Sequence, residues 1–194
     1  MSKEHKTMQE KENPVIPADK EYTMSAEKAN LYAIFFFIPV AIFMIIPYLL
    51  VHKFDKSLIT GFKGINILWF VIAMLVGIVV HEGIHGLFLG YFAPSRYKSI
   101  SFGVHWKMLT PYCHCNEAMQ ARHYRIGLMM PLVLLGLLPF VVAMFIGHTG
   151  LFLFSIIFTL AAGGDMLIYW LMRKIESTTI VKDHPHKIGF YIAE

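Results

Sequence analysis

The amino-acid sequence predicts an all-α membrane protein with about four transmembrane helices and a short β-hairpin-like or re-entrant segment between the second and the third. The chain has 194 residues, of which 56% are hydrophobic and only 15% are charged. Its mean hydropathy of +0.56 is too high for an ordinary soluble domain. Four apolar stretches each reach about 20 residues, the length at which a helix crosses a bilayer. The remaining length predicts one compact unit without a separate large soluble domain.

The first 28 residues predict a polar N-terminal tail. Acidic and basic side chains alternate there, and Pro14 and Pro17 interrupt any continuous helix. This composition favours a disordered or surface-lying segment, and it lacks the apolar core and cleavage site of a secretory signal. We therefore divide the chain into the tail (1–28), a four-helix transmembrane domain (29–174) and a cytoplasmic C-terminal segment (175–194).

Apolar runs predict the four spans at 31–51, 65–92, 123–146 and 151–172. Pro39 and Pro47 lie inside the first span and predict a kinked helix, which neighbouring helices or waters can accommodate. The second span ends at an Ala-Pro-Ser sequence after Phe92, and Arg173 and Lys174 anchor the end of the fourth at an interface.

The segment 99–115, with the sequence SISFGVHWKMLTPYCHC, connects the second and third spans. It is rich in β-branched and aromatic residues, which alternate in part with polar ones. This pattern predicts a hairpin or a re-entrant edge.

The distribution of basic residues predicts the orientation of the spans. Of the 17 Lys and Arg residues, three lie in the loop between the first two spans, and the other 14 lie in the two terminal segments and in the loop between the second and third spans. The positive-inside rule therefore places both termini in the cytoplasm and the chain in the cell membrane as a multi-pass protein. The basic balance is explained by topology, so we expect no nucleic-acid partner.

The second span carries His81, Glu82 and His85 in an H-E-x-x-H pattern. Two imidazoles four residues apart on a helix lie about 40° apart around the axis and about 6 Å apart along it, so both can reach one cation. Glu82 is then placed beside the metal as a base. An ionisable residue at membrane depth costs about 2.5–3.5 kcal/mol and marks a function or a partner. The pattern predicts a Zn²⁺ site.

Asp165 is the predicted third ligand. It is the only acidic residue in the apolar part of the first, third and fourth spans. His81 comes about 24 Å after the start of its span and Asp165 about 21 Å after the start of a span with the same direction, so their depths agree. A catalytic zinc site takes three protein ligands and leaves one position for water, which His81, His85 and Asp165 satisfy. Gly163 and Gly164 before it predict a close helix contact.

Simpler interpretations exist for each of these residues. Histidines at this spacing occur by chance, and Asp165 alone could cap a broken helix, pair with an arginine or accept a proton in transport. Arg125 lies near the start of the third span, where its charged side chain can reach out to the membrane interface. Less simply, it could help to stabilise a developing oxyanion. Tyr112, His114 and Asn116 are candidates to line a polar cavity that leads water to the metal.

Cys113 and Cys115 are the only cysteines, too few for a disulfide framework. On a strand both would lie on the same face, where His105 or His123 could join them in a second, structural metal site. A lone C-x-C pattern is weak evidence, and free reduced thiols are the simpler interpretation.

Four motifs, HEGIHGL, TPYCHCNEAM, RHYRIGLMMP and FTLAAGGDMLIYWLMRK, together resemble the family of small multipass bacterial proteins of the zincin peptidase type. The resemblance covers about residues 65–192, and more distantly the layout is similar to the site-2 protease core. It implies that His81 and His85 bind zinc, that Glu82 is the general base and that Asp165 completes the ligand set.

The sequence therefore predicts a zinc-dependent intramembrane or juxtamembrane metallopeptidase. Its expected partners are the lipid bilayer and a transmembrane or membrane-associated protein substrate, whose extended segment could pair with the edge of the 99–115 hairpin. The alternative is a non-proteolytic membrane protein that binds a divalent metal for transport, sensing or scaffolding. The sequence indicates neither the substrate nor the oligomeric state.

Overall fold

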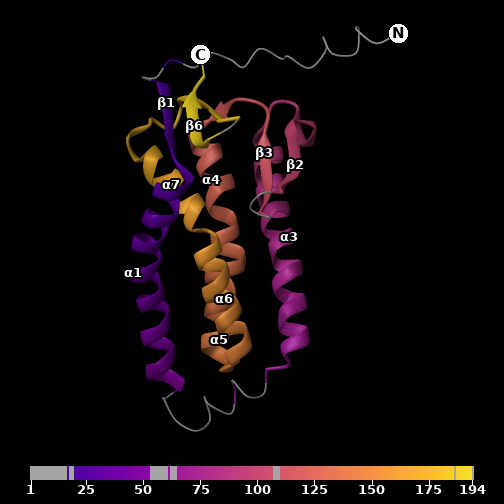
Figure 1. Cartoon of the computed structure of the whole chain (residues 1–194), viewed down its shortest axis with the longest axis vertical. Helices are drawn as coiled ribbons and strands as arrows, with labels where there is room; N and C mark the ends of the chain where they lie inside the picture. The colour runs from indigo at the N-terminus through magenta and orange to yellow at the C-terminus, as the bar shows by residue number, and fades with distance from the viewer. Residues whose placement is uncertain are drawn as a thin grey trace, which may run out of the picture.

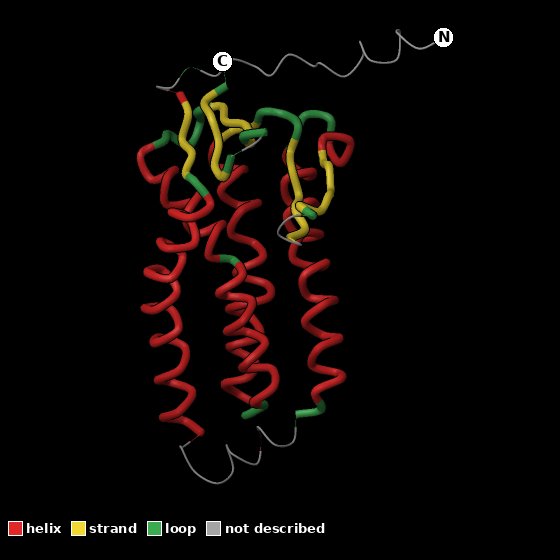
Figure 2. Tube along the Cα trace, in the orientation of Figure 1, coloured by secondary structure: helices red, strands yellow, loops and turns green. Residues whose placement is uncertain are grey.

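A bundle of long helices carries two small sheets at one of its ends (Figure 1). The structure is a computed structural model, and it describes residues 17, 20–52, 61, 65–106, 110–185 and 187–193. Within these residues the element order is β1, α1, α3, β2, β3, β4, α4, α5, α6, α7, β5 and β6. Figure 2 shows that helices make up most of the described chain and that the strands gather at the end where its first and last described segments lie. The helical part of the predicted all-α class is confirmed.

Three helices are long and apolar enough to cross a membrane, and one bent pair adds a fourth candidate. The first is α1 (Ala26–His52), which includes Pro39 and Pro47. The second is α3 (Ile67–Phe92). Asn66 is its N-cap, and the Asn66 side chain accepts a hydrogen bond from the Trp69 N–H. Large apolar side chains cover their outer faces, and Phe43, Leu50 and Val79 are each at least 70% exposed.

The third candidate span changes its helical geometry midway. It consists of α4 (Ala121–Pro131), a π-helix (Leu132–Leu137) and α5 (Leu138–Ile146). Pro131 and Pro139 flank the π-helical residues, and because proline has no N–H it removes a regular helical hydrogen bond at each place. Gly147 ends α5 with a φ of 67°, a left-handed conformation that suits glycine.

The fourth span is broken rather than continuous. It consists of α6 (Thr149–Ala161) and α7 (Gly163–Leu171), which meet at an angle of 41°. Gly163 and Gly164 have low helix propensity, and they follow the break directly. A Cβ on Gly164 would have no heavy atom within 4 Å, so the close helix contact predicted for this glycine pair does not occur at Gly164. The break instead places Asp165 in the first turn of α7.

The predicted hairpin between the second and third spans is confirmed. Strands β2 (Ile100–His105) and β3 (Thr110–Cys115) pair in an antiparallel register that sets Phe102 opposite Cys113. The hairpin packs against the last turns of α3, where Gly86 leaves room for it. A Cβ on Gly86 would lie only 2.4 Å from the Phe102 ring.

A four-stranded sheet, in the order β1-β6-β5-β4, was not predicted, so an all-α class is too narrow. Its strands are β1 (Glu21–Met24), β4 (Met119–Gln120), β5 (Ile180–Asp183) and β6 (Ile188–Ile192). Tyr22 and Phe190 are register partners whose rings stack with centroids 5.2 Å apart. Gly189 has a φ of 134°, and a Cβ there would lie 2.1 Å from the Tyr22 carbonyl oxygen. The sheet thus joins the N-terminal tail to the C-terminal segment.

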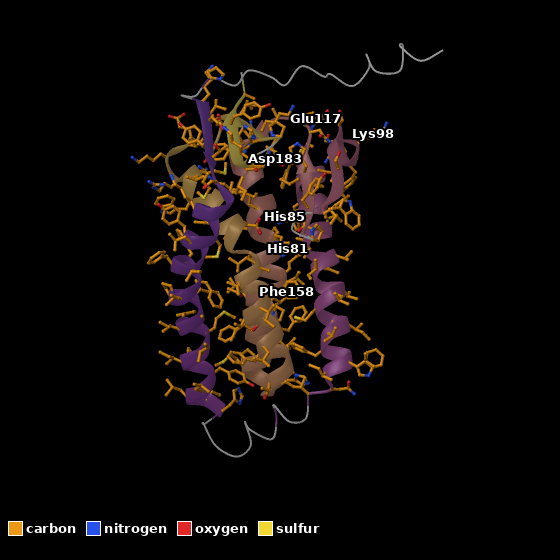
Figure 3. The ribbon with its side chains drawn as sticks, in the orientation of Figure 1. His81, His85, Lys98, Glu117, Phe158 and Asp183 are labelled. Atoms are coloured by element: carbon orange, nitrogen blue, oxygen red, sulfur yellow. The ribbon has the colours of Figure 1, made fainter. Side chains whose placement is uncertain are left out.

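Two apolar cores stabilise opposite ends of the bundle. The core beneath the sheets includes Tyr124, Met172, Val181 and Phe190, all at most 1% exposed. In the core at the other end, Tyr48 and Phe152 stack with centroids 3.8 Å apart. Figure 3 shows His81 and His85 between these ends, nearer to the sheets.

Candidate metal centre

Helix α3 presents both motif histidines to the inside of the bundle. His81 and His85 are 7% and 6% exposed, and their rings lie 4.9 Å apart between centroids, as expected for residues one turn apart on one face. Gly77, one turn before His81, lets α6 come close, because a Cβ there would lie 2.3 Å from the Phe158 ring. The Phe158 ring lies in turn 6.4 Å from that of His81.

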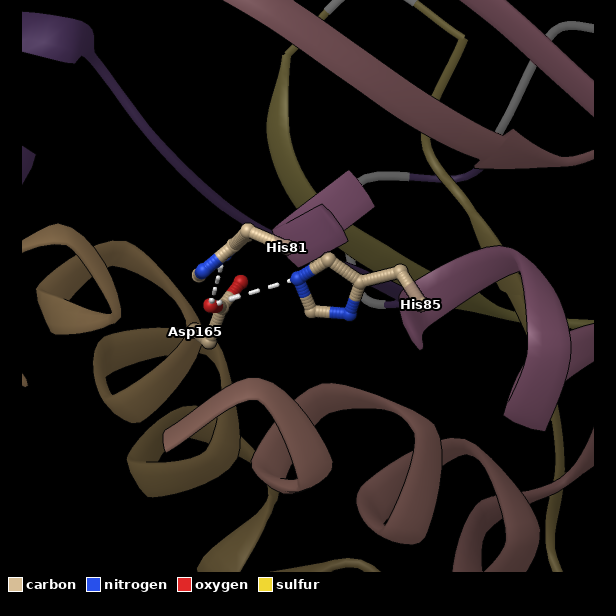
Figure 4. Close-up of side chains that lie close together, drawn as sticks. All are labelled: His81, His85 and Asp165. Carbon is tan, nitrogen blue, oxygen red and sulfur yellow. Dashed lines mark ion pairs between the residues drawn. The ribbon is translucent and has the colours of Figure 1, made fainter. Parts of the chain in front are cut away.

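Asp165 faces the two histidines from α7. Its Oδ2 atom lies 3.3 Å from Nε2 of His81 and 3.3 Å from Nε2 of His85 (Figure 4). The structure therefore brings together the three residues that the sequence predicts from spacing and matched depth. Asp165 is in the first turn of its helix, where the helix dipole favours a negative charge.

The hydrogen bond of His85 Nδ1 determines whether Nε2 of the same ring can bind a metal. His85 Nδ1 lies 2.9 Å from the backbone carbonyl oxygen of Gly127, and both atoms are buried. A carbonyl only accepts hydrogen bonds, so Nδ1 carries the proton, and in the neutral ring Nε2 is left with a lone pair. That lone pair faces Asp165, which also offers only lone pairs when ionised.

The three facing atoms fit a zinc ion. Two donors that each bind zinc at about 2.0–2.1 Å with tetrahedral angles lie about 3.3 Å apart, which matches the distances from Asp165 to both histidines. The Asp165 Oδ2 and His81 Nδ1 atoms are buried without a hydrogen-bond partner. Among the described residues, one group of His, Cys, Asp and Glu converges within 4.8 Å in this way, and it consists of His81, His85 and Asp165.

Glu82 lies beside the donors but is not one of them. Its side chain is half-buried and close enough to His81, His85 and Asp165 for their charges to act on it. The backbone N–H of Cys113 is hydrogen-bonded to its carboxylate. The third motif residue is therefore held between the metal donors and strand β3.

Asp183 anchors the same edge of strand β3 two residues further along. Its carboxylate on β5 accepts hydrogen bonds from the Cys115 N–H, at 2.9 Å, and from the Tyr124 hydroxyl. His114 Nδ1 lies 3.6 Å from the same carboxylate. The C-terminal sheet thus fixes the strand that contacts Glu82, a role that sequence reasoning missed because a single acidic residue in a polar tail gives no signal.

Other predicted residues lie elsewhere. Arg125 donates to the carbonyl oxygens of Met172, at 2.6 Å, and of Ile175, so it caps the end of the fourth candidate span. The Asn116 side chain donates to the Ser99 carbonyl at 3.0 Å, which makes it a bracing residue of the hairpin.

A cavity of about 580 Å³ lies away from the metal donors. It opens between the first turns of α3 and α6, at the end opposite to the sheets, and Trp69, Phe70, His148 and Phe154 are among its lining residues. Phe158, which packs on Phe154 with ring centroids 4.5 Å apart, separates this cavity from His81. The position of the cavity does not favour it as the route to the metal.

The thiols of Cys113 and Cys115 are free, as the simpler interpretation predicts. Cys115 is fully buried and lies 3.5 Å from the Glu117 carbonyl oxygen. The His123 ring stacks on Phe92 with centroids 4.3 Å apart. The side chain of His105 lies outside the described part of the chain, and the described residues hold no metal cluster that includes a cysteine.

We expect Cys115 to react slowly with iodoacetamide in the folded protein. Burial raises the pKa of its thiol from 9.0 to about 11, so the reactive thiolate is about 100-fold scarcer at pH 8 than in an exposed thiol. Mass spectrometry of alkylated peptides from native and denatured protein measures the ratio. Equal rates in both states would contradict the buried position of Cys115.

The fold and the donor set define a class of protein: an apolar helical protein with an H-E-x-x-H helix and an aspartate on a later helix facing the same metal position. A family model described as "Putative zincin peptidase" matches residues 74–180, more than half of the chain. The chain belongs to this family. No curated protein and no solved structure matches it. The matched segment includes Glu82 and all three metal donors.

Proposed function

We propose that this protein is a zinc-dependent intramembrane or juxtamembrane metallopeptidase that hydrolyses peptide bonds of membrane-associated proteins. One observation supports this above the others: one ligand atom from each of His81, His85 and Asp165 lies within 4.8 Å of the other two, and Glu82 lies beside them. When bound there, zinc supplies a Lewis acid that polarises the scissile carbonyl and lowers the pKa of water.

Glu82 acts as the general base in this proposal. Its carboxylate takes a proton from the attacking water and passes it to the nitrogen of the departing amine as the C–N bond breaks. The Cys113 N–H, which is hydrogen-bonded to this carboxylate, holds it in place between the two steps. His85 is held by Gly127, so the water and the substrate meet a preorganised set of groups.

The membrane setting of the proposal rests on the helices and on charge. The four candidate spans expose apolar side chains along their length, a surface that suits lipid. The sheets and both ends of the described chain lie at one end of the bundle, which also carries Arg122, Arg173, Lys174, Lys182 and other basic residues (Figure 1). The positive-inside rule favours the cytoplasm for that end.

A substrate segment could align along strand β3. The N–H of Cys113 is hydrogen-bonded to Glu82, and the N–H of Cys115 is hydrogen-bonded to Asp183. The edge of β3 that lies away from β2 therefore faces the candidate metal centre. An extended segment laid along this edge, as in strand addition, would bring its peptide bonds beside Glu82. The hairpin and the metal centre would then form one substrate site.

The test compares peptides released from membrane proteins in cells that carry wild type, Glu82→Gln or Glu176→Gln. Glu176 is exposed, so its variant is a matched control for the loss of one carboxylate. We expect quantitative proteomics to find cleavage products that disappear with Glu82→Gln alone and accumulation of their precursors. Identical peptide profiles in all three strains would favour a metal carrier or scaffold instead.

A further inference from the structure

We propose that Pro131 is a positioning residue for His85 and that it acts through the backbone carbonyl of Gly127. This inference rests on the proposed zinc centre and explains how one of its ligands is held. The carbonyl oxygen of Gly127 accepts the Nδ1 proton of His85 at 2.9 Å, although the two residues are 42 positions apart in the chain.

The carbonyl is available because of the residue four positions later. In a regular α-helix the carbonyl of residue 127 accepts the N–H of residue 131. Residue 131 is proline, which has no N–H, and the N–H of Leu132 goes to the Met129 carbonyl. A buried carbonyl needs a donor from another source. His85 on α3 provides it.

The same proline also turns the carbonyl toward α3. The ring of a proline inside a helix clashes with the carbonyl four residues earlier, and such a carbonyl tilts away from the helix axis. Gly127 lets the two helices approach, because a Cβ there would lie 2.3 Å from Cδ2 of Leu89, which is one turn beyond His85 on α3. Glycine therefore permits the contact, and proline leaves the carbonyl free to make it.

The consequence concerns the tautomer of His85. With the proton held on Nδ1, the Nε2 lone pair faces Asp165 and is ready for a metal. If residue 131 had an N–H, the Gly127 carbonyl could accept it and no longer hold the proton of His85 on Nδ1. The His85 proton could then move to Nε2, where the ring would donate it to Asp165. That hydrogen bond would occupy two of the three metal donors at once.

The test compares the zinc dissociation constants of full-length wild type, Pro131→Ala, Pro131→Gly and Pro139→Ala, purified in detergent, by competition with a chromophoric chelator. Both Pro131 variants restore an N–H at position 131. We expect the dissociation constant to rise about 10-fold to 100-fold in each, the usual effect of losing a partner of a metal-bound histidine. Pro139→Ala makes the same chemical change about 12 Å further along the span and should leave the constant unchanged.

A second measurement separates positioning from packing. Alanine and glycine differ in volume and helix propensity but restore the same N–H, so the proposal expects equal effects, with the same change in the visible spectrum of the Co²⁺-substituted protein. Unchanged constants and spectra in both Pro131 variants would overturn it. An equal loss of zinc affinity in Pro139→Ala would overturn it as well, and so would failure of both Pro131 variants to fold. A wild type that binds no zinc would overturn the proposed function as well, which distinguishes the two failures.

Discussion

Glu82→Gln is expected to slow peptide hydrolysis by about 10²-fold to 10⁴-fold while leaving zinc bound. Glutamine has nearly the shape of glutamate but does not take up a proton, so the variant loses the general base and its contribution to the rate. The metal should remain, because Glu82 is not among the converging donor atoms. The measurement is kcat/KM on a purified substrate found by proteomics, together with zinc content by mass spectrometry.

The glutamine variant also preserves the local structure. Its side-chain oxygen still accepts a hydrogen bond from the Cys113 N–H, so β3 stays in place and a change in rate is not a change in fold. Glu82→Ala would remove that acceptor as well and is the less informative variant. Activity within tenfold of wild type would show that Glu82 is not the base, and loss of zinc would show that its carboxylate is needed for the metal.

The sequence was sufficient to predict how the metal donors come together. Helical spacing places His81 and His85 on one face, and counting residues from the ends of two spans places Asp165 at a similar depth. Both arguments use the regular rise of a helix through a layer of fixed thickness. The meeting of these residues in the structure follows from that regularity, although the fourth span is broken at Ala162.

The four-stranded sheet could not be predicted in the same way. Strand β1 is only four residues long, lies in a polar tail, and pairs with β6 at the other end of the chain. Pairing between strands so far apart in sequence depends on the packing of the bundle, and it leaves no local alternation of apolar and polar residues in the sequence. The β6 sequence IGFYI does have strand composition, and it was an available signal.

The partner of His85 was missed for a different reason. The hydrogen bond is made by a backbone carbonyl, and sequence patterns describe side chains. A signal was nevertheless present, since a proline inside an apolar span always leaves one carbonyl without its helical donor. Applied to Pro131, this rule identifies Gly127, but only the packing of α4 on α3 shows which side chain uses the carbonyl.

Asp165→Asn is expected to weaken zinc binding at least about 100-fold. Structural zinc sites with four protein ligands bind the ion with apparent free energies of about 10–16 kcal/mol, which is roughly 3 kcal/mol for each ligand. Because every 1.4 kcal/mol changes the dissociation constant about tenfold, the loss of one ligand costs at least about 100-fold. Asparagine retains the shape but lacks the charge that a buried dication requires. Competition with a chelator measures the constant. Zinc binding within tenfold of wild type would exclude Asp165 from the ligand set.

The same substitution should not destabilise the metal-free protein. Without metal, Asp165 Oδ2 lies 3.3 Å from Nε2 of His81, and because His81 Nδ1 has no hydrogen-bond partner, the His81 proton is best placed on Nε2, facing the carboxylate. An asparagine can accept the His81 hydrogen bond through Oδ1 and donate to the Nε2 lone pair of His85 through Nδ2, and these bonds offset the loss of about 0.3–1 kcal/mol from the interaction of the carboxylate with the dipole of α7. We therefore expect the Tm of the metal-free variant to stay close to that of metal-free wild type, while the zinc-dependent rise in Tm is lost. If Asp165 served to cap the broken helix, the metal-free variant would instead melt several degrees lower. The two thermal scans therefore distinguish a ligand, whose loss removes only the zinc-dependent part of the stability, from a residue that holds the fold together.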